Sequence, residues 1–221
     1  MTTEERQEVA GIVRDTLRSD PGLLRDALRG LEADDARQQL AATQNALAVI
    51  GSRLINPQDP VAGNPLGDVT IVNFYDTRCP YCRQMLPIEA ELLRQDPGVR
   101  IVNKDLPVLG ATSQLEARAL LAAQRQGGYF KLQSIIMGRP AVSTRDTLRA
   151  DADRLGLDGG RLLRDIDDPA IKDRLAATIA MADQLQIQGT PALVVGDRLL
   201  SGAQTLDELK AAVSQARAVR K

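Results

Sequence analysis

The stretch that decides the fold lies between residues 69 and 82 and reads Val69-Thr70-Ile71-Val72-Asn73-Phe74-Tyr75-Asp76-Thr77-Arg78-Cys79-Pro80-Tyr81-Cys82. Its first half is rich in β-branched and aromatic residues, which is the composition of a short buried strand. A helical pattern begins near Arg83, so the two cysteines lie where a strand meets the first turn of a helix. The free N–H groups and partial positive charge of a helix N-terminus stabilise a thiolate, the reactive form of cysteine. The stretch therefore predicts thiol–disulfide chemistry.

The composition excludes several functional classes. The 221 residues carry a formal net charge of −1 and include two cysteines and no histidine. A balanced charge gives no indication of a nucleic-acid partner. Without imidazole, histidine-based general base catalysis and the usual zinc sites are excluded, and we expect neither a metal centre of that kind nor a cofactor. No stretch approaches roughly 18 apolar residues, so we expect no insertion into a membrane.

Helical and turn patterns divide the chain into three parts. Residues 1–55 predict a helical arm, residues 56–68 a linker with three prolines, and residues 69–221 an α/β domain. Within the domain, a strand, a helix and a strand are followed by an all-helical insertion at about 113–187, then by a hairpin and a final helix. Strand–helix–strand implies a parallel pair of strands with a right-handed crossover. The predicted fold is a mixed sheet interrupted by helices.

The arm carries a heptad stripe. Its members recur at alternating intervals of three and four residues and are Ala33, Ala36, Leu40, Thr43, Leu47, Ile50 and Leu54. Such a stripe is typical of a coiled coil, although a helix that packs on its own domain gives the same pattern over so few heptads. An arm with few aromatic residues has little apolar surface of its own to cover the stripe. We therefore expect the arm to mediate a homo-oligomer.

The Cys-x-x-Cys motif has two interpretations, a redox centre or a structural pair of cysteines. A loop of four residues gains little stability from a disulfide, because the entropic gain grows with loop length. Both cysteines of the chain fall in this loop, directly after a predicted buried strand. We therefore favour the redox interpretation. Cys79 and Cys82 lie one helical turn apart, so one thiol can attack a mixed disulfide formed by the other.

These motifs resemble those of a known family. Phe74-Tyr75-Asp76, the two cysteines and the later Gly189-Thr190-Pro191-Ala192 are similar to the DsbA-like branch of the thioredoxin superfamily. The helical arm and Pro65-Leu66-Gly67-Asp68 narrow the likeness to the suppressor-of-copper-sensitivity protein C (ScsC) group. The resemblance implies an α/β thioredoxin fold with an all-helical insertion and an N-terminal helical oligomerisation arm, for which it favours a trimer.

The resemblance also implies roles for the residues of the site. Cys79 is expected to be the nucleophile and Cys82 the resolving cysteine. Thr190-Pro191 is expected to form a cis peptide that faces the disulfide and binds substrate. A trans bond is the default from the sequence alone, because only about 5–6% of X–Pro bonds in folded proteins are cis; the family likeness reverses that expectation.

Five further residues are expected to modulate the site, namely Pro80, Tyr81, Arg78, Asn73 and Lys104. Relatives usually carry a buried acid six residues before the nucleophile, where it ferries the proton of the resolving thiol, and this chain has Asn73 there. Lys104 and Asp105, at the end of the next strand, are candidates to handle that proton, or they form a solvated pair. Tyr81 stands where strongly oxidising relatives have histidine. We therefore expect a couple less oxidising than about −120 mV, with Arg78 adding some positive potential.

The function implied by the resemblance is that of a periplasmic thiol–disulfide oxidoreductase, most simply a disulfide isomerase or reductase. Its expected substrates are misoxidised or unfolded secreted proteins, and its expected electron donor is a membrane-bound thiol reductase. A secretion signal is expected to have been removed from this sequence. Two alternatives remain. One is a DsbA-like dithiol oxidase, and the other is a copper-tolerance protein that binds Cu(I) at Cys79 and Cys82, because closely spaced thiolates suit Cu(I).

Overall fold

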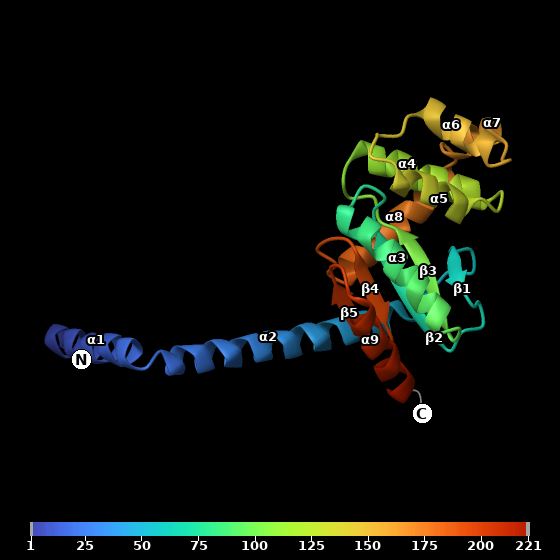
Figure 1. Ribbon diagram of the computed structural model, residues 1–221. Coiled ribbons are helices and arrows are strands. Elements are labelled where there is room, and N and C mark those ends of the chain that lie inside the picture. The colour runs from blue at the N-terminus through green and yellow to red at the C-terminus, as the bar shows by residue number, and fades with distance from the viewer. Residues whose placement is uncertain (1, 220–221) are drawn as a thin grey trace. The chain divides into compact units, whose positions relative to one another are not determined.

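The computed structural model describes residues 2–219 (Figure 1). The chain forms two compact units, which divide between Ala42 and Thr43. The first unit contains α1 (Thr3–Ser19) and the first part of α2 (Pro21–Ile50). α1 begins with a capping box in which Thr2 and Glu5 exchange hydrogen bonds between side chain and backbone. Pro21 opens α2, a position that suits its fixed φ and missing N–H.

The helices of the first unit carry apolar side chains that nothing in the single chain covers. α1 has no buried residue. The large apolar residues exposed on this unit are Val9, Ile12, Val13, Leu17, Leu23, Leu24, Leu28, Leu31 and Leu40. Val9, Ile12, Val13 and Leu17 of α1 recur at intervals of three and four, as do Leu24, Leu28 and Leu31 of α2, so each of these two sets lies along one face of its helix. Within residues 2–219, no helix combines the length and the apolarity needed to cross a membrane.

The second unit is built on a mixed sheet of five strands in the order β1–β3–β2–β4–β5. The strands are β1 (Val61–Gly63), β2 (Val69–Tyr75), β3 (Val99–Asp105), β4 (Ala192–Val195) and β5 (Arg198–Ser201). β2 and β3 are parallel and are joined through α3 (Pro80–Gln95), while the other pairs are antiparallel. The predicted strand–helix–strand unit and the predicted α/β fold are confirmed.

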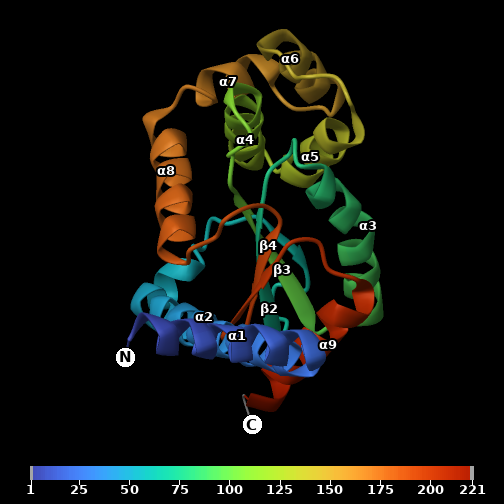
Figure 2. The same ribbon diagram turned by 90° about the vertical axis from the view of Figure 1, so that its left-hand side faces the viewer.

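Helices cover both faces of the sheet and one end of it. α3 and α9 (Leu206–Val219) pack on one face, and α8 (Pro169–Gln184) packs on the other with the end of α2. The remaining helices are α4 (Ala111–Gln124), α5 (Tyr129–Gly138), α6 (Arg145–Arg154) and α7 (Gly159–Asp165). Figure 2 shows α4 to α7 gathered at one end of the sheet, with α3 and α8 on opposite sides of it. These helices and α8 form the predicted insertion between β3 and β4.

Successive residues of β2 face different cores, as the alternation of a strand requires. Ile71 packs with α3 and α9, whereas Val72 and Phe74 pack with α8 and the end of α2. Tyr75, the last residue of the strand, belongs to a third cluster that contains both cysteines and the buried side chains of the insertion. The strand therefore delivers the cysteines to the boundary between the sheet and the helical insertion.

The C-terminal end of α2 belongs to the second unit. Thr43 and Ile50 are buried, and Leu47 and Leu54 pack against the same cluster as Phe74. The heptad stripe of the predicted arm therefore has two parts, since its second half packs on the sheet of its own chain. After α2 come a short 3₁₀ helix (Gly51–Leu54) and then the segment predicted to be an irregular linker, which contains β1.

We expect Ile50→Ala to lower the free energy of unfolding of the second unit by about 2–4 kcal/mol, because it leaves a cavity in a closed core. Val49, the preceding residue, keeps 74% of its surface exposed. The matched variant Val49→Ala should therefore change that free energy by less than about 0.5 kcal/mol. Urea unfolding followed by circular dichroism measures both. Equal effects of the two substitutions would contradict the packing of α2 on the sheet.

Candidate active site

The two cysteines occupy the start of α3. Cys79 is its N-cap, with an extended backbone, and Pro80 is its first residue, where proline suits a helix start. Both thiols are free, and Cys79 and Cys82 expose only 4% and 3% of their surface. Pro80 and Tyr81 between them are exposed. The motif therefore lies at the surface of the second unit with both cysteine side chains buried.

The Thr190–Pro191 peptide is cis, as predicted. Ala192 pairs with Phe74 in the sheet, which brings the two residues before β4 next to the segment that follows β2. The Cys79 Sγ donates a hydrogen bond to the carbonyl oxygen of Thr190 at 3.1 Å. The structure thus brings together the predicted nucleophile and the predicted substrate-binding segment, which are 111 residues apart in the chain.

The carboxylate of Asp76 shapes the turn that presents Cys79, a role that sequence analysis did not assign. Asp76 is buried, and one of its oxygens accepts a hydrogen bond from the Arg78 N–H at 2.7 Å. The other accepts from the backbone N–H groups of residues 108 and 109 at 2.9 and 3.0 Å. The Cys79 N–H donates to the Asp76 carbonyl at 3.1 Å. One side chain therefore joins the cysteine turn to the loop before α4.

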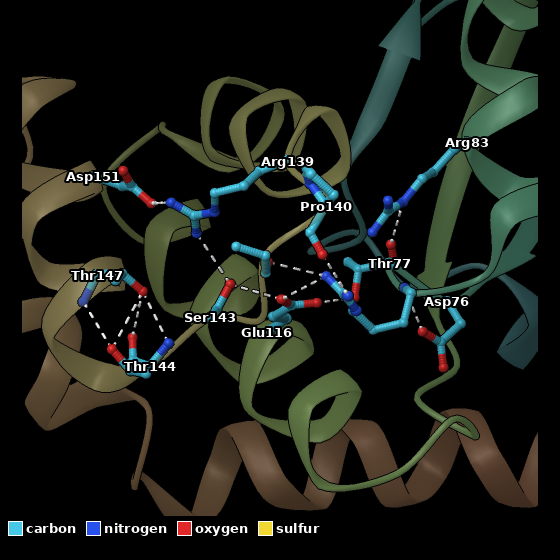
Figure 3. A network of polar contacts seen from close by, with 12 residues as sticks. Asp76, Thr77, Arg83, Glu116, Arg139, Pro140, Ser143, Thr144, Thr147 and Asp151 are labelled. Carbon is cyan, nitrogen blue, oxygen red and sulfur yellow. Dashed lines mark hydrogen bonds and ion pairs between the residues drawn. The ribbon is translucent and has the colours of Figure 1, made fainter.

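Arg78 is tied to the helical insertion. Its guanidinium donates to the carbonyl oxygens of residues 140 and 141 at 3.0 and 3.3 Å and lies 3.8 Å from the carboxylate of Glu116. Glu116 has no exposed surface and accepts hydrogen bonds from the hydroxyls of Thr77 and Ser143, each at 2.6 Å (Figure 3). Because the charge of Arg78 is partly balanced by Glu116, it adds less positive potential at the thiols than its place in the sequence suggests.

The two candidates for proton handling at the end of β3 lie in different surroundings, and neither is solvated. Lys104 forms a buried ion pair with Asp59 at 2.6 Å, on the face of the sheet that carries Phe74. Asp105 lies at the level of Tyr75 and accepts hydrogen bonds from the hydroxyls of Tyr75 and Tyr129 at 3.0 Å. Burial raises the pKa of Asp105 to about 7. Asp105 therefore bonds to two residues of the cysteine cluster, Tyr75 and Tyr129.

Asn73 lies beneath α3 and contacts a carboxyl group that sequence analysis missed. Its Nδ2 donates to the Oε1 of Glu89 at 2.9 Å. Glu89 is on the buried face of α3, which it shares with Cys82, Met85 and Leu92. A signal was present in the sequence, since the four residues follow one another at intervals of three, four and three, and only one of them carries a charge. Burial raises the pKa of Glu89 to about 8.

Burial also acts on the second thiol of the motif, because desolvation raises the pKa of Cys82 to about 12. The Cys82 thiol is therefore protonated at neutral pH. Among residues 2–219, no group of three or more cysteine, aspartate and glutamate side chains is arranged to hold a metal ion. The chemistry that this arrangement supports is sulfur exchange at Cys79, beside the cis-proline segment.

The profile of the DSBA-like thioredoxin domain matches residues 70–214. The chain belongs to this family. A thioredoxin-like oxidoreductase from Silicibacter pomeroyi shares 39% identity, with 75% of this chain and 95% of that chain covered and a TM-score of 0.71. ScsC from Proteus mirabilis, in a transitional conformation, shares 26% identity over 99% of this chain and 98% of its own, also with a TM-score of 0.71. The predicted family is confirmed.

A curated relative places a similar sequence inside a larger protein. The Na(+)/H(+) antiporter NhaA 3 of Salinispora tropica is 33% identical over 190 residues, which is 80% of this chain and 29% of the antiporter. The chain therefore spans less than a third of the length of the curated relatives that it matches. The likeness to the solved oxidoreductases, in contrast, extends over nearly their whole length.

We expect brief alkylation of the reduced protein with iodoacetamide at about pH 7 to modify Cys79 and to leave Cys82 intact. The reason is that the thiolate is the reactive form, and a thiol with a pKa of about 12 is protonated at this pH. Peptide mass spectrometry locates the label. In guanidinium chloride, where burial is lost, both cysteines should react. Preferential labelling of Cys82 in the folded protein would contradict this order.

Proposed function

We propose that this chain is a periplasmic thiol–disulfide oxidoreductase that acts on protein substrates as a disulfide isomerase or reductase. The observation that supports it most is the free Cys79 thiol at the start of α3, 3.1 Å from the carbonyl oxygen of Thr190 in the cis-proline segment. A backbone segment beside the thiol offers hydrogen bonds to an extended substrate chain. Membership of the DSBA-like family and the likeness to a thioredoxin-like oxidoreductase support the same class.

The proposed reaction is two successive sulfur exchanges. The Cys79 thiolate attacks one sulfur of a substrate disulfide, so that a Cys79–substrate bond forms, the substrate S–S bond breaks and the other substrate sulfur leaves as a thiolate. A second thiol of the substrate can then attack the mixed disulfide. That step returns Cys79 as a thiolate and leaves a different substrate disulfide, with no net oxidation or reduction. This route is isomerisation.

Resolution by Cys82 gives reduction instead. The Cys82 sulfur attacks the sulfur of Cys79, the Cys79–Cys82 disulfide forms, and the substrate leaves with two more electrons. A dithiol donor must then return two electrons to this disulfide, and we propose a membrane-bound thiol reductase as that donor. Because the pKa of Cys82 is raised to about 12, Cys82 is a slow attacking group at neutral pH. Substrate thiols therefore compete with Cys82 for the mixed disulfide, and their attack gives isomerisation.

Assays on ribonuclease test this proposal. We expect the reduced protein to reactivate scrambled ribonuclease, Cys79→Ser to abolish the activity, and Cys82→Ser to retain reactivation while losing net reduction of insulin. The physical reason is that substrate thiols can replace Cys82 in isomerisation but not in reduction. The outcome that would overturn the proposal is fast oxidation of reduced ribonuclease without reactivation of the scrambled form. That result would establish the DsbA-like dithiol oxidase instead.

We also propose that residues 1–55 mediate a homo-oligomer, with a trimer favoured. The apolar side chains exposed on α1 and on the first part of α2 support this, because a single chain leaves them in water. Several copies of the dithiol around one substrate suit an isomerase that acts on misoxidised or unfolded secreted proteins. The likeness to Proteus mirabilis ScsC covers 99% of this chain, the arm included.

The arm is testable with two matched variants of the full chain. Leu24 and Leu28 are about half exposed and lie one turn apart, as do Arg25 and Arg29 on the polar face. We expect Leu24→Ser with Leu28→Ser to reduce the mass in solution to that of one 23.9 kDa chain, and Arg25→Ser with Arg29→Ser to preserve the oligomer. Light scattering measures both. Equal masses for the two variants would refute an apolar interface on this face.

Copper tolerance is the alternative role of a different class. The observation that favours it is the presence of two free thiols on one turn of α3, since Cu(I) accepts low coordination by soft thiolates. Competition for Cu(I) against a chelator, repeated with each cysteine replaced by serine, separates the roles. Stoichiometric binding of Cu(I) by a protein that does not turn over disulfides would favour the metal role.

A further inference from the structure

Glu89 is a carboxyl group inside an otherwise apolar layer. It exposes 8% of its surface and lies between α3 and the sheet. On its own helix the buried neighbours are Cys82, Met85 and Leu92, and the buried residues of α9, which packs against α3, are Leu209, Ala212 and Val213. Burial alone raises the pKa of Glu89 to about 8, and no charged side chain of the described residues contributes to that shift. A carboxyl group in this layer therefore changes its charge near neutral pH rather than near pH 4.

The strands beneath Glu89 present neutral partners. Asn73 of β2 donates to Glu89 at 2.9 Å, and its Nδ2 is also 3.4 Å from the Oδ1 of Asn103 on β3. The next residues on this face are Tyr75 and Asp105, which bond to each other. Lys104, with its partner, lies on the opposite face. Within residues 2–219, the one hydrogen bond of the Glu89 side chain is therefore with an amide, and no cation is paired with it.

Asn73 suits both protonation states of Glu89. Its Nδ2–H donates to the Oε1 of Glu89 at 2.9 Å, a hydrogen bond that an ionised carboxylate accepts. Its Oδ1 is buried and has no hydrogen-bond partner among the described residues. Once the amide turns over, that oxygen can accept the O–H of the protonated acid. A lysine or arginine at this position would hold Glu89 ionised, whereas an amide lets it gain and lose a proton.

Glu89 lies on the same buried face of α3 as the thiol that must lose a proton. Cys82 and Glu89 are two turns apart on one face of α3, about 10 Å between Cα atoms. Side chains of a helix lean toward its N-terminus, and here that direction leads from Glu89 toward Cys82. Cys82 is buried, and its pKa is raised to about 12. A nearby base that is partly ionised at neutral pH is what its deprotonation requires.

We propose that Glu89, positioned by Asn73, takes up the proton that Cys82 loses when the mixed disulfide at Cys79 is resolved. This inference rests on the proposed function. In the step, the Cys82 S–H bond breaks and its proton goes to the Glu89 carboxylate, while the Cys82 sulfur forms a bond to the Cys79 sulfur. The bond between Cys79 and the substrate sulfur breaks, and the substrate leaves as a thiolate that takes a proton from water. Glu89 later returns its proton to the solvent.

Asp105 is the competing carboxyl group, and its contacts are less suited to this role. Both of its oxygens already accept hydrogen bonds from the hydroxyls of Tyr75 and Tyr129, and these donors favour the ionised form over uptake of a proton. It also lies on β3 rather than on the helix of the dithiol. Glu89 has one neutral partner and shares its helix face with Cys82.

The test uses dithiobis(nitrobenzoate), an aromatic disulfide that releases a coloured thiolate at each exchange. Attack by Cys79 releases the first equivalent, and resolution by Cys82 releases the second. In the natural protein the rate of the second release should rise with pH, with its midpoint near pH 8, where Glu89 is half ionised, and level off about one pH unit higher. In Glu89→Gln this bend should disappear, and the rate at about pH 8 should fall about 10- to 100-fold. The first release should be unchanged.

Three further variants make the result specific. Glu91→Gln, at a partly exposed carboxylate of the same helix that pairs with Arg94, should leave both releases unchanged. Cys82→Ser should abolish the second release only. The double variant Asn73→Asp with Glu89→Gln exchanges the acid and the amide across their 2.9 Å contact and should restore the bend. If the role of Glu89 were only structural, glutamine would fill the same place. In that case the second release would not slow down in Glu89→Gln, and the double variant would have nothing to restore.

A titration of the side-chain carbons by NMR gives the second readout. The carboxyl carbon of Glu89, assigned with Glu89→Gln, should titrate near pH 8 rather than near pH 4, because burial disfavours the carboxylate. An unchanged second release in Glu89→Gln, or a midpoint near pH 4, would overturn the inference. If the first release does not occur at Cys79, the proposed function itself fails.

Discussion

The position of the dithiol depends on one buried carboxylate. Asp76 accepts hydrogen bonds from the turn that leads to Cys79 and from the loop before α4. Since Asp76 follows β2 directly, these contacts fix where the chain leaves the sheet and in which direction α3 begins. The pairing of β4 with β2 then brings Thr190 to the same end of the sheet. The 3.1 Å contact between Cys79 and Thr190 follows from these two constraints together.

Buried carboxyl groups surround the dithiol, and their partners differ in kind. Glu116 accepts two hydroxyl hydrogen bonds and lies beside the guanidinium of Arg78. Asp105 is held by two tyrosines and Glu89 by one amide, and burial raises the pKa of both. Glu116 ties the cysteine turn to the helical insertion, whereas Asp105 and Glu89 are able to exchange protons near neutral pH. The thiolate site is thus set in a layer whose charge responds to pH.

The helical arm illustrates how one pattern can serve two purposes. Its heptad stripe runs from Ala33 to Leu54. The members from Thr43 onward are buried or pack on the sheet, whereas the earlier ones are exposed in the single chain. The spacing of a stripe shows that a helix has an apolar face, but not which surface covers that face. Packing on the same chain describes the part of α2 from Thr43 onward, and the coiled coil stays a prediction for the part before it.

The sequence by itself determined the strand and helix that hold the cysteines, the parallel pair of strands and the helical insertion, because local periodicity carries that information. It also determined the membership of a redox family, because the motifs that indicate it are made of adjacent residues. Only the tertiary structure decided which polar residues meet. In the sequence, Asp76 belongs to the motif Phe74-Tyr75-Asp76, but nothing there assigns it a role. Glu89 is a charged residue in the apolar stripe of its helix, and the sequence does not explain why. Their partners lie far along the chain, at residues 108–109 and at Asn73. Burial, which sets the proton affinities of Glu89 and Cys82, is a property of the assembled layers rather than of any one segment.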